Sequence, residues 1–167
     1  PTYNQADFLK VALRSVLDQT FQDFEVIVVN NHSTDHTLDA IAEAGDGRVE
    51  VINFENHGVI GAARNVGINA SRGDCVAFLD SDDAWYPKKL EKVAEVIAAD
   101  PNVGLVCHDQ DIFRDGHKTT VARTGPLSDS GGEVYDYLLL RSNCVSTSSA
   151  VVARRYLAEV GNFSEDP

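Results

Sequence analysis

The sequence predicts an α/β fold with a largely parallel central sheet. Short apolar, β-branched runs alternate along the 167 residues with longer segments whose apolar residues recur at helical spacing. Several of these runs are continuously apolar, which is typical of strands buried on both faces of a parallel sheet. A chain of this length makes one domain and buries about 70% of its unfolded surface.

The first third of the chain is expected to form a helix, a strand and a polar loop. Residues 5–18 carry a helical apolar stripe, with Asn4 as the expected N-cap and Asp7 in a capping-box-like position. The stripe consists of Leu9, Ala12, Leu13, Val16 and Leu17. Residues 24–29 form a β-branched apolar run, a buried strand, which ends in the polar segment 30–35.

The same criteria place the remaining elements in order. A second helix carries Leu38, Ile41 and Ala42 and stops at Gly45 and Gly47. The later helices are expected over 61–71, from Pro87 to Asp100, over 134–140 and over 154–160 before Gly161. The later strands are expected at 49–53, 75–80, 103–108 and 149–153, and residues 112–125 read as a loose hairpin or loop.

Composition limits the possible partners. A net charge of −12 argues against nucleic acid or an anionic lipid surface as a dominant partner. No apolar stretch approaches the roughly 20 residues that span a bilayer, and no signal peptide is visible. Cys75, Cys107 and Cys144 are widely spaced and odd in number, so we expect small buried hydrophobes in a reducing compartment.

An acidic turn follows the strand expected at 75–80. The buried run Val76–Leu79 ends in Asp80, Asp82 and Asp83, three carboxylates within four residues. In open α/β sheets the carboxyl ends of strands are where ligands bind. Carboxylates this close repel one another unless a cation offsets them, and manganese or magnesium favours carboxylate oxygen and also holds substrate phosphates. A solvated helix-capping turn is the alternative for such a cluster in isolation.

Two further polar clusters are expected at the same sheet edge, namely residues 1–4 and 30–35. Together the clusters suit a nucleoside diphosphate. Asn31 is placed to bond a base edge and Tyr3 to offer a ring face, while Asp80 is placed for ribose hydroxyls and Asp82 for a metal. Arg64 adds a permanently charged, bidentate donor.

Other polar residues favour structural roles. Ser33 and Asp35 are expected to cap a helix, and Trp85 to pack at a helix start. His108 ends a strand on the ligand edge beside two aspartates, so a metal role is open, although we favour a structural one.

Two long segments resemble the family 2 glycosyltransferases with the GT-A fold. They are PTYNQADFLKVALRSVLDQTFQDFEVIVVNNHSTDHT and ARNVGINASRGDCVAFLDSDDAWYPKKL, and 160–163 resembles the family's "GGF" segment. The resemblance covers about residues 1–163, and several motifs match in order and spacing. It implies a Rossmann-like nucleotide-sugar-binding fold with helices on both faces of a mostly parallel sheet, incomplete at both ends.

Carried over by position, the resemblance implies roles for individual residues. Thr2 and Tyr3 would line the nucleotide pocket, Asn31 would contact the base, and Arg64 would lie beside the nucleotide. Asp80-Ser81-Asp82 would be the DXD motif, with Asp80 among the nucleotide-binding residues and Asp82 as the metal ligand. Asp83 would face the sugar as a catalytic-site residue.

The resemblance also implies an activity. We expect inverting, metal-dependent transfer of a hexosyl group from a nucleotide-diphosphate sugar, with UDP favoured, to a hydroxyl of a glycan or lipid-linked acceptor in polysaccharide or lipopolysaccharide synthesis. Residues 1–109 would form the nucleotide-binding part and 110–167 the start of the acceptor-side part. The protein would be cytoplasmic, with a peripheral position at the inner membrane face as an alternative.

The chain departs from the family pattern in three places. Asn30-Asn31 stands where the family has two aspartates, a strand is expected before Pro1, and the catalytic base is expected beyond residue 167. A catalytically inactive nucleotide- or glycan-binding module is therefore the main alternative. A nucleotidyltransferase would need a Gly-rich basic loop near the first strand, and a phospho-acceptor domain would need a lone Asp at a strand end with a Lys at a later strand end. Neither pattern is found in the sequence.

Overall fold

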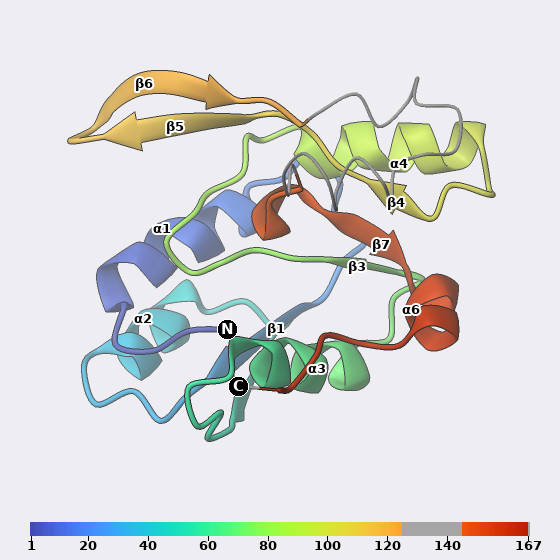
Figure 1. The fold of residues 1–167 in the computed structure, drawn as a ribbon. Coiled ribbons are helices and arrows are strands. Elements are labelled where there is room, and N and C mark those ends of the chain that lie inside the picture. The colour runs from blue at the N-terminus through green and yellow to red at the C-terminus, as the bar shows by residue number, and fades with distance from the viewer. Residues whose placement is uncertain (125–144, 167) are drawn as a thin grey trace.

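The computed structural model describes residues 1–124 and 145–166. Helices and strands alternate through most of this range (Figure 1). The helices are α1 (Ala6–Leu17), α2 (Thr37–Ala44), α3 (Ile60–Ala70), α4 (Lys89–Ala99) and α6 (Arg154–Val160), with a 3₁₀ turn η1 (Thr147–Ser149). The strands are β1 (Val26–Asn30), β2 (Val49–Asn53), β3 (Cys75–Ala77), β4 (Leu105–Val106), β5 (Gln110–Arg114), β6 (His117–Ala122) and β7 (Val151–Ala153).

The strands pair in three groups. β1 and β2 are parallel, with Val26 opposite Val49 and Asn30 opposite Asn53. β7 lies between β3 and β4 and is antiparallel to both, so β3 and β4 run in the same direction. β5 and β6 form an antiparallel hairpin that extends away from the body of the molecule (Figure 1). The α/β class is confirmed, but only the β1–β2 pair is parallel among the hydrogen-bonded strand pairs of the described residues.

Two apolar clusters hold these layers together. One joins α1 and α2 to β1 through Leu9, Leu13, Val28 and Ile41. The other joins α3 and β3 to the segment before β7 through Ile68, Val76, Phe78 and Ala150. Each cluster combines residues from distant parts of the sequence, because helix stripes and strand faces are buried only against one another.

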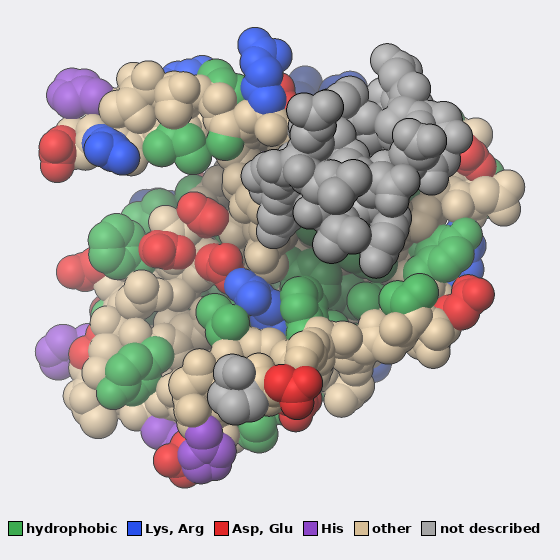
Figure 2. All heavy atoms as spheres, in the orientation of Figure 1, with side chains coloured by type: hydrophobic (Ala, Val, Ile, Leu, Met, Phe, Trp, Pro, Cys, Tyr) green, Lys and Arg blue, Asp and Glu red, His purple; other side chains and the backbone are tan. Residues whose placement is uncertain are grey.

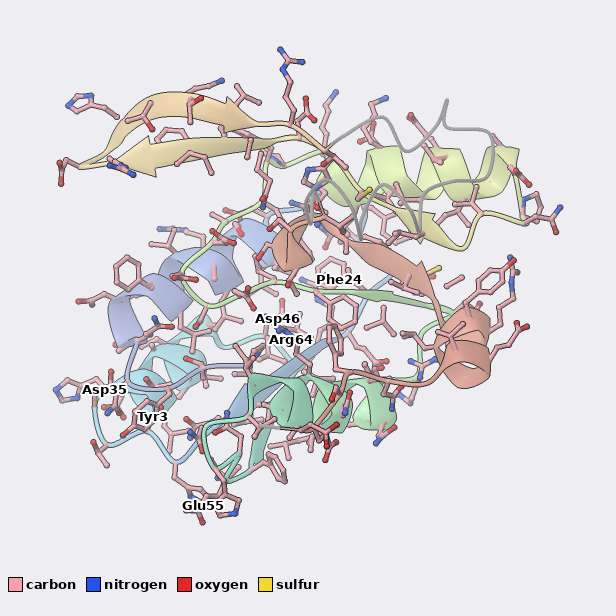
Figure 3. The ribbon with its side chains drawn as sticks, in the orientation of Figure 1. Tyr3, Phe24, Asp35, Asp46, Glu55 and Arg64 are labelled. Carbon is pink, nitrogen blue, oxygen red and sulfur yellow. The ribbon has the colours of Figure 1, made fainter. Side chains whose placement is uncertain are left out.

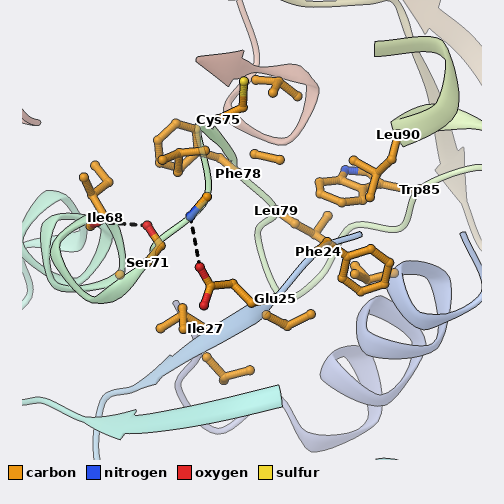
Figure 4. Close-up of a pocket in the computed structure, with 18 of the residues that line it drawn as sticks. Phe24, Glu25, Ile27, Ile68, Ser71, Cys75, Phe78, Leu79, Trp85 and Leu90 are labelled. Carbon is orange, nitrogen blue, oxygen red and sulfur yellow. Dashed lines mark hydrogen bonds between the residues drawn. The ribbon is translucent and has the colours of Figure 1, made fainter. Parts of the chain in front are cut away.

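A cavity of about 840 Å³ separates β1 from β3. Figure 4 looks into it, with Glu25 and Ile27 on the β1 side and Cys75 and Phe78 on the β3 side. Its lining is mostly apolar, and Thr2 makes a parallel bridge to Asn30 beside it. The strand expected before Pro1 stays a prediction.

The expected elements differ from the observed ones mainly at their ends. β3 ends at Ala77, one residue before a pair that is only half made. Phe78 donates its N–H to the carbonyl of Ala150, but the N–H of Ala150 donates to Thr147 in η1 and not back to Phe78. The strand expected at 103–108 is reduced to Leu105–Val106. The loose hairpin or loop expected at 112–125 is a hairpin that begins at Gln110, with a shift of register between Ile112 and Phe113. α4 begins at Lys89 rather than at Pro87. The helix expected at 134–140 lies outside the described residues.

The expected N-cap of the first helix is wrong. Asn4 has a left-handed φ of 49°, and Gln5 occupies the N-cap position without a side-chain cap. The Asp35 carboxylate from the second polar loop accepts the N–H of Ala6 instead, at 3.1 Å. A distant carboxylate thus replaces the local cap that the sequence predicts.

The described residues contain no helix that is both long and apolar enough to cross a membrane. Cys75 lies half-buried in β3, where burial raises the pKa of its thiol. Cys107 follows β4 directly, and Cys144 lies outside the described residues.

Candidate nucleotide and metal site

The first two polar loops are joined by backbone and side-chain hydrogen bonds. Thr2 continues the parallel ladder of β1, donating its N–H to the carbonyl of Val29 and accepting the N–H of Asn31. The Asn4 N–H donates to Ser33 Oγ, and Asn4 Oδ1 accepts the N–H of Thr34 at 2.7 Å. Because four hydrogen bonds join Thr2 and Asn4 to β1 and the second loop, the two loops form one continuous surface at the end of β1.

The two asparagines at the end of β1 make different contacts. Asn30 is fully buried and donates from Nδ2 to Asn53 Oδ1 of the neighbouring strand at 2.8 Å. Asn31 is half-buried, and its Oδ1 accepts the N–H of Asn56. This bond holds the Asn31 amide at the loop edge. Of the two asparagines, only Asn31 is partly exposed.

Arg64 and Asp80 form the central ion pair of the site. Arg64 Nη2 donates to Asp80 Oδ1 at 2.7 Å, and the two side chains are only 11% and 30% exposed. Arg64 points from α3 toward the middle of the molecule (Figure 3). Tyr3 and Asp35 lie farther out, near α2, in the same view. Its guanidinium lies 5.4 Å from the Phe163 ring centroid, and its Nε is buried without a partner among the described residues.

The three aspartates of the acidic turn have different surroundings. Asp80 is half-buried and paired with Arg64, whereas Asp82 and Asp83 are exposed. Within the part of the chain that the structure describes, the Asp82 carboxylate makes no hydrogen bond or ion pair. Ser81 is buried and donates from Oγ to Gln5 Oε1, which ties the turn to the first loop. Acidic side chains gather next to a basic one beneath the β5–β6 hairpin (Figure 2).

The chemistry of this turn fits a divalent cation. No group of three or more His, Cys, Asp and Glu side chains forms a metal site within residues 1–124 and 145–166. A three-ligand cluster is not required, because magnesium-type ions are held by one or two carboxylates and complete their coordination with water and substrate phosphates. Asp82 and Asp83, both exposed and without a hydrogen bond or ion pair to their carboxylates among the described residues, meet that description.

The two expected pocket residues at the chain start behave differently. Thr2 is 5% exposed, and its Oγ1 is buried without a hydrogen-bond partner in the described ranges. Tyr3 is 56% exposed, so its ring is available at the surface. The structure therefore brings all seven expected site residues to one region: Thr2, Tyr3, Asn31, Arg64, Asp80, Asp82 and Asp83.

The histidine and tryptophan near this edge have structural contacts. His108 is half-buried, with Nδ1 at 2.8 Å from the Asp109 carbonyl, and burial lowers the pKa of the imidazole. Its Nε2 is buried without a partner among the described residues. The indole Nε1 of Trp85 donates to the Ser148 carbonyl, so the expected packing role of Trp85 is confirmed.

Sequence reasoning missed three residues that support the site. Lys89 is buried and donates to the Ser148 carbonyl, and Ser148 also accepts the N–H of Asp80. Asn65 holds the backbone of Phe163 beside Arg64. For Lys89, the one signal in the sequence was its position on the otherwise apolar stripe of α4, which indicates a buried charge. Ser148 and Asn65 carry no local signal, because these partners lie 59 or more residues away in sequence.

Solved structures share this fold. Staphylococcus aureus TarS 1–349 in complex with UDP aligns with 99% of this chain and 48% of its own, at 24% identity and a TM-score of 0.78. A mannosyltransferase, PcManGT from Pyrobaculum calidifontis in complex with GDP-Man and Mn²⁺, aligns with 99% of this chain and 46% of its own, at 22% identity and a TM-score of 0.73. The GT-A fold expected from the sequence is thereby confirmed.

Sequence relatives agree. The uncharacterized glycosyltransferase alr2836 of Nostoc sp. is 35% identical over 94% of this chain and 50% of its own length. WfgD of Escherichia coli, a UDP-Glc:alpha-D-GlcNAc-diphosphoundecaprenol beta-1,3-glucosyltransferase, is 35% identical over 54% of this chain and 36% of its own. The chain spans half or less of the length of these relatives. The profile of glycosyl transferase family 2 matches residues 1–161, and the chain belongs to that family.

Proposed function

We propose that this chain is the donor-binding part of an inverting, metal-dependent glycosyltransferase that uses a UDP-sugar. The proposal rests on one observation in the acidic turn. Asp80 is paired with Arg64, while Asp82 is exposed and has no pair among the described residues. The partly buried Arg64–Asp80 pair fixes one carboxylate of the turn and leaves Asp82 exposed beside it, an arrangement that suits a cation-bound diphosphate.

The nucleotide is assigned to the surface formed by the first two loops. Asn31 takes a base edge, Tyr3 offers its exposed ring, and Thr2 Oγ1 is a buried hydroxyl without a partner in the described ranges. Asp80, held by Arg64, accepts from ribose hydroxyls. The UDP complex of TarS supports a uridine donor, although Asn31 replaces an acidic residue in the family pattern.

The diphosphate is assigned to the edge of the turn. Asp82 would hold manganese or magnesium, which offsets the charge that builds on the departing diphosphate. Asp83 lies next to it on the sugar-facing side and orients the transferred hexosyl group for attack by the acceptor hydroxyl. The Mn²⁺ complex of the mannosyltransferase relative supports this metal.

The acceptor is a hydroxyl of a glycan or lipid-linked glycan, in cell-surface polysaccharide synthesis. WfgD, with its diphosphoundecaprenol-linked acceptor, supports this class. The donor half is assigned to residues 1–109 and the beginning of the acceptor side to 110–167. A cytoplasmic location, peripheral at the membrane when the acceptor is lipid-linked, goes with such a substrate.

Isothermal titration of the natural full-length protein with UDP, with and without MnCl₂, tests the proposal. We expect Mn²⁺ to tighten UDP binding by about tenfold or more, and Asp82→Ala to remove that gain. Asp74→Ala, an exposed aspartate before β3, is the control. Binding that is equal with and without Mn²⁺, or unaffected by Asp82→Ala, would refute the metal assignment. Binding without sugar transfer would identify an inactive binding module.

A further inference from the structure

Ser148 lies directly behind the acidic turn. It belongs to η1, which precedes β7, and it is only 1% exposed. Its Oγ accepts the backbone N–H of Asp80 at 3.0 Å, although the two residues are 68 positions apart. A hydroxyl that reaches the first residue of the turn fixes where that turn leaves strand β3.

The Ser148 carbonyl holds the other end of the turn. It accepts one hydrogen bond from the indole N–H of Trp85 at 2.9 Å and another from Nζ of Lys89 at 2.8 Å. Lys89 is 7% exposed, and its Nζ also lies 3.8 Å from the centroid of the Trp85 ring. One buried residue therefore binds both Asp80, where the turn begins, and Trp85, just after it ends.

Asp82 lies between the two fixed ends of the turn. Arg64 pairs with Asp80 at 2.7 Å, whereas Asp82 is exposed and without a pair among the described residues. Because Ser148 holds both the backbone N–H of Asp80 and the indole of Trp85, the backbone between them has little freedom to turn the Asp82 carboxylate away from its outward position.

We propose that Ser148 is a positioning residue that presents Asp82 to the cation–diphosphate unit of the donor, with Lys89 as its support. This inference rests on the proposed function and deepens it. Preorganised ligands bind more tightly because the ordering cost is met during folding. Loss of the Ser148 hydroxyl therefore weakens the metal-dependent part of UDP binding more than the metal-independent part.

The neighbouring serine provides a matched control. Ser149 is 0% exposed in the same turn, but its Oγ donates to the Ser146 carbonyl and does not reach the acidic turn. Ser148→Ala and Ser149→Ala each remove one buried hydroxyl from η1. A merely structural role would give the two variants the same effect on stability and no selective effect on metal coupling.

The test measures the dissociation constant of UDP with and without MnCl₂ in the natural full-length protein, and takes their ratio as the metal coupling. We expect Ser148→Ala to reduce this ratio by about fivefold to tenfold, because the variant loses the hydrogen bond between the Ser148 hydroxyl and the Asp80 N–H. Ser149→Ala should leave it unchanged. An unchanged ratio in Ser148→Ala, or equal reductions in both variants, overturns the inference.

A second pair keeps the test decisive if Ser148→Ala does not fold. Lys89→Met removes the buried ammonium, and Lys92→Met removes an exposed one on the same helix that pairs with Glu95. The metal coupling should fall only in Lys89→Met, and equal values in both variants overturn the inference. If the wild-type protein shows no metal-dependent UDP binding, the proposed function itself fails. If only the variants fail to differ, the proposed function stands without Ser148.

Discussion

The side-chain amide of Asn65 binds the backbone of Phe163 at both of its polar groups. Asn65 Oδ1 accepts the Phe163 N–H at 3.0 Å, and Nδ2 donates to the Phe163 carbonyl at 2.9 Å. The Phe163 ring packs edge-on against Phe78, with 5.3 Å between centroids, and lies next to the Arg64 guanidinium. Asn65 thus joins a segment almost 100 residues away to the helix that carries Arg64.

Replacing Asn65 by alanine should destabilise the protein by about 2 kcal/mol, because a buried amide loses its hydrogen bonds and leaves the Phe163 backbone unsatisfied. Urea denaturation measures the loss. Asn69→Ala, an exposed asparagine on the same helix, should change stability by less than about 0.5 kcal/mol. Equal effects of the two substitutions would show that the contact with Phe163 contributes nothing.

Gly61 should not tolerate a side chain. A Cβ at this position would lie 2.4 Å from the Ser164 carbonyl oxygen and 3.3 Å from the Phe163 Cβ. We expect Gly61→Ala to cost about 1–3 kcal/mol despite the better helix propensity of alanine. Gly67→Ala in the same helix meets only Val29 Cγ2, at 3.5 Å, and should be neutral or stabilising in the same thermal or urea melt. A neutral Gly61→Ala would contradict the close packing of this segment.

Lys89 should make stability rise with pH above neutrality. Burial lowers the pKa of Lys89 to about 7 from 10.5, and the charge of Asp83 opposes this shift in part. Between these two values the folded protein binds fewer protons than the unfolded chain, so the free energy of unfolding increases as pH rises through that window. Below pH 7 both states are protonated, and the cost of burying the charge is fully present.

Urea denaturation between pH 6 and pH 10 checks this dependence. The difference in stability between wild type and Lys89→Met should change with pH above about 7, with wild type gaining. Lys92→Met, which removes an exposed charge of α4, should run parallel to wild type. Parallel curves for wild type and Lys89→Met would mean that Lys89 does not titrate in this range.

Arg64 and Asp82 should separate nucleotide binding from metal binding. Arg64→Met removes the partner of Asp80, so we expect UDP to bind about tenfold more weakly both with and without MnCl₂. Asp82→Ala should weaken binding only when MnCl₂ is present. Arg72→Met, which removes an exposed arginine paired with Glu25, is the charge control for calorimetry. A loss in Arg64→Met that depends on Mn²⁺ would assign Arg64 to the metal edge instead.

Much of the secondary structure could be predicted from local patterns. The strand at 49–53 and the helix from 154 to Gly161 were predicted at their observed bounds. Both were predicted from nearby residues alone, namely a short apolar run for the strand and a terminating glycine for the helix. Predictions failed at Asn4, Pro87 and residues 78–80, where the decisive hydrogen bond comes from elsewhere in the chain. β3 is short because the N–H of Ala150 donates to the Thr147 carbonyl in η1 instead of to Phe78, and no local pattern around residue 78 records that bond.

The sequence by itself determined the α/β class, the family and the identity of the residues at the acidic turn, because these depend on periodicity and on contiguous motifs. Only the tertiary structure decided that Asp80 is paired, whereas the carboxylates of Asp82 and Asp83 make no hydrogen bond or ion pair among the described residues. Arg64 of α3 pairs with Asp80, and Ser148 holds the start of the turn. Each of these contacts joins residues from different elements, so the availability of Asp82 is a property of the packed fold.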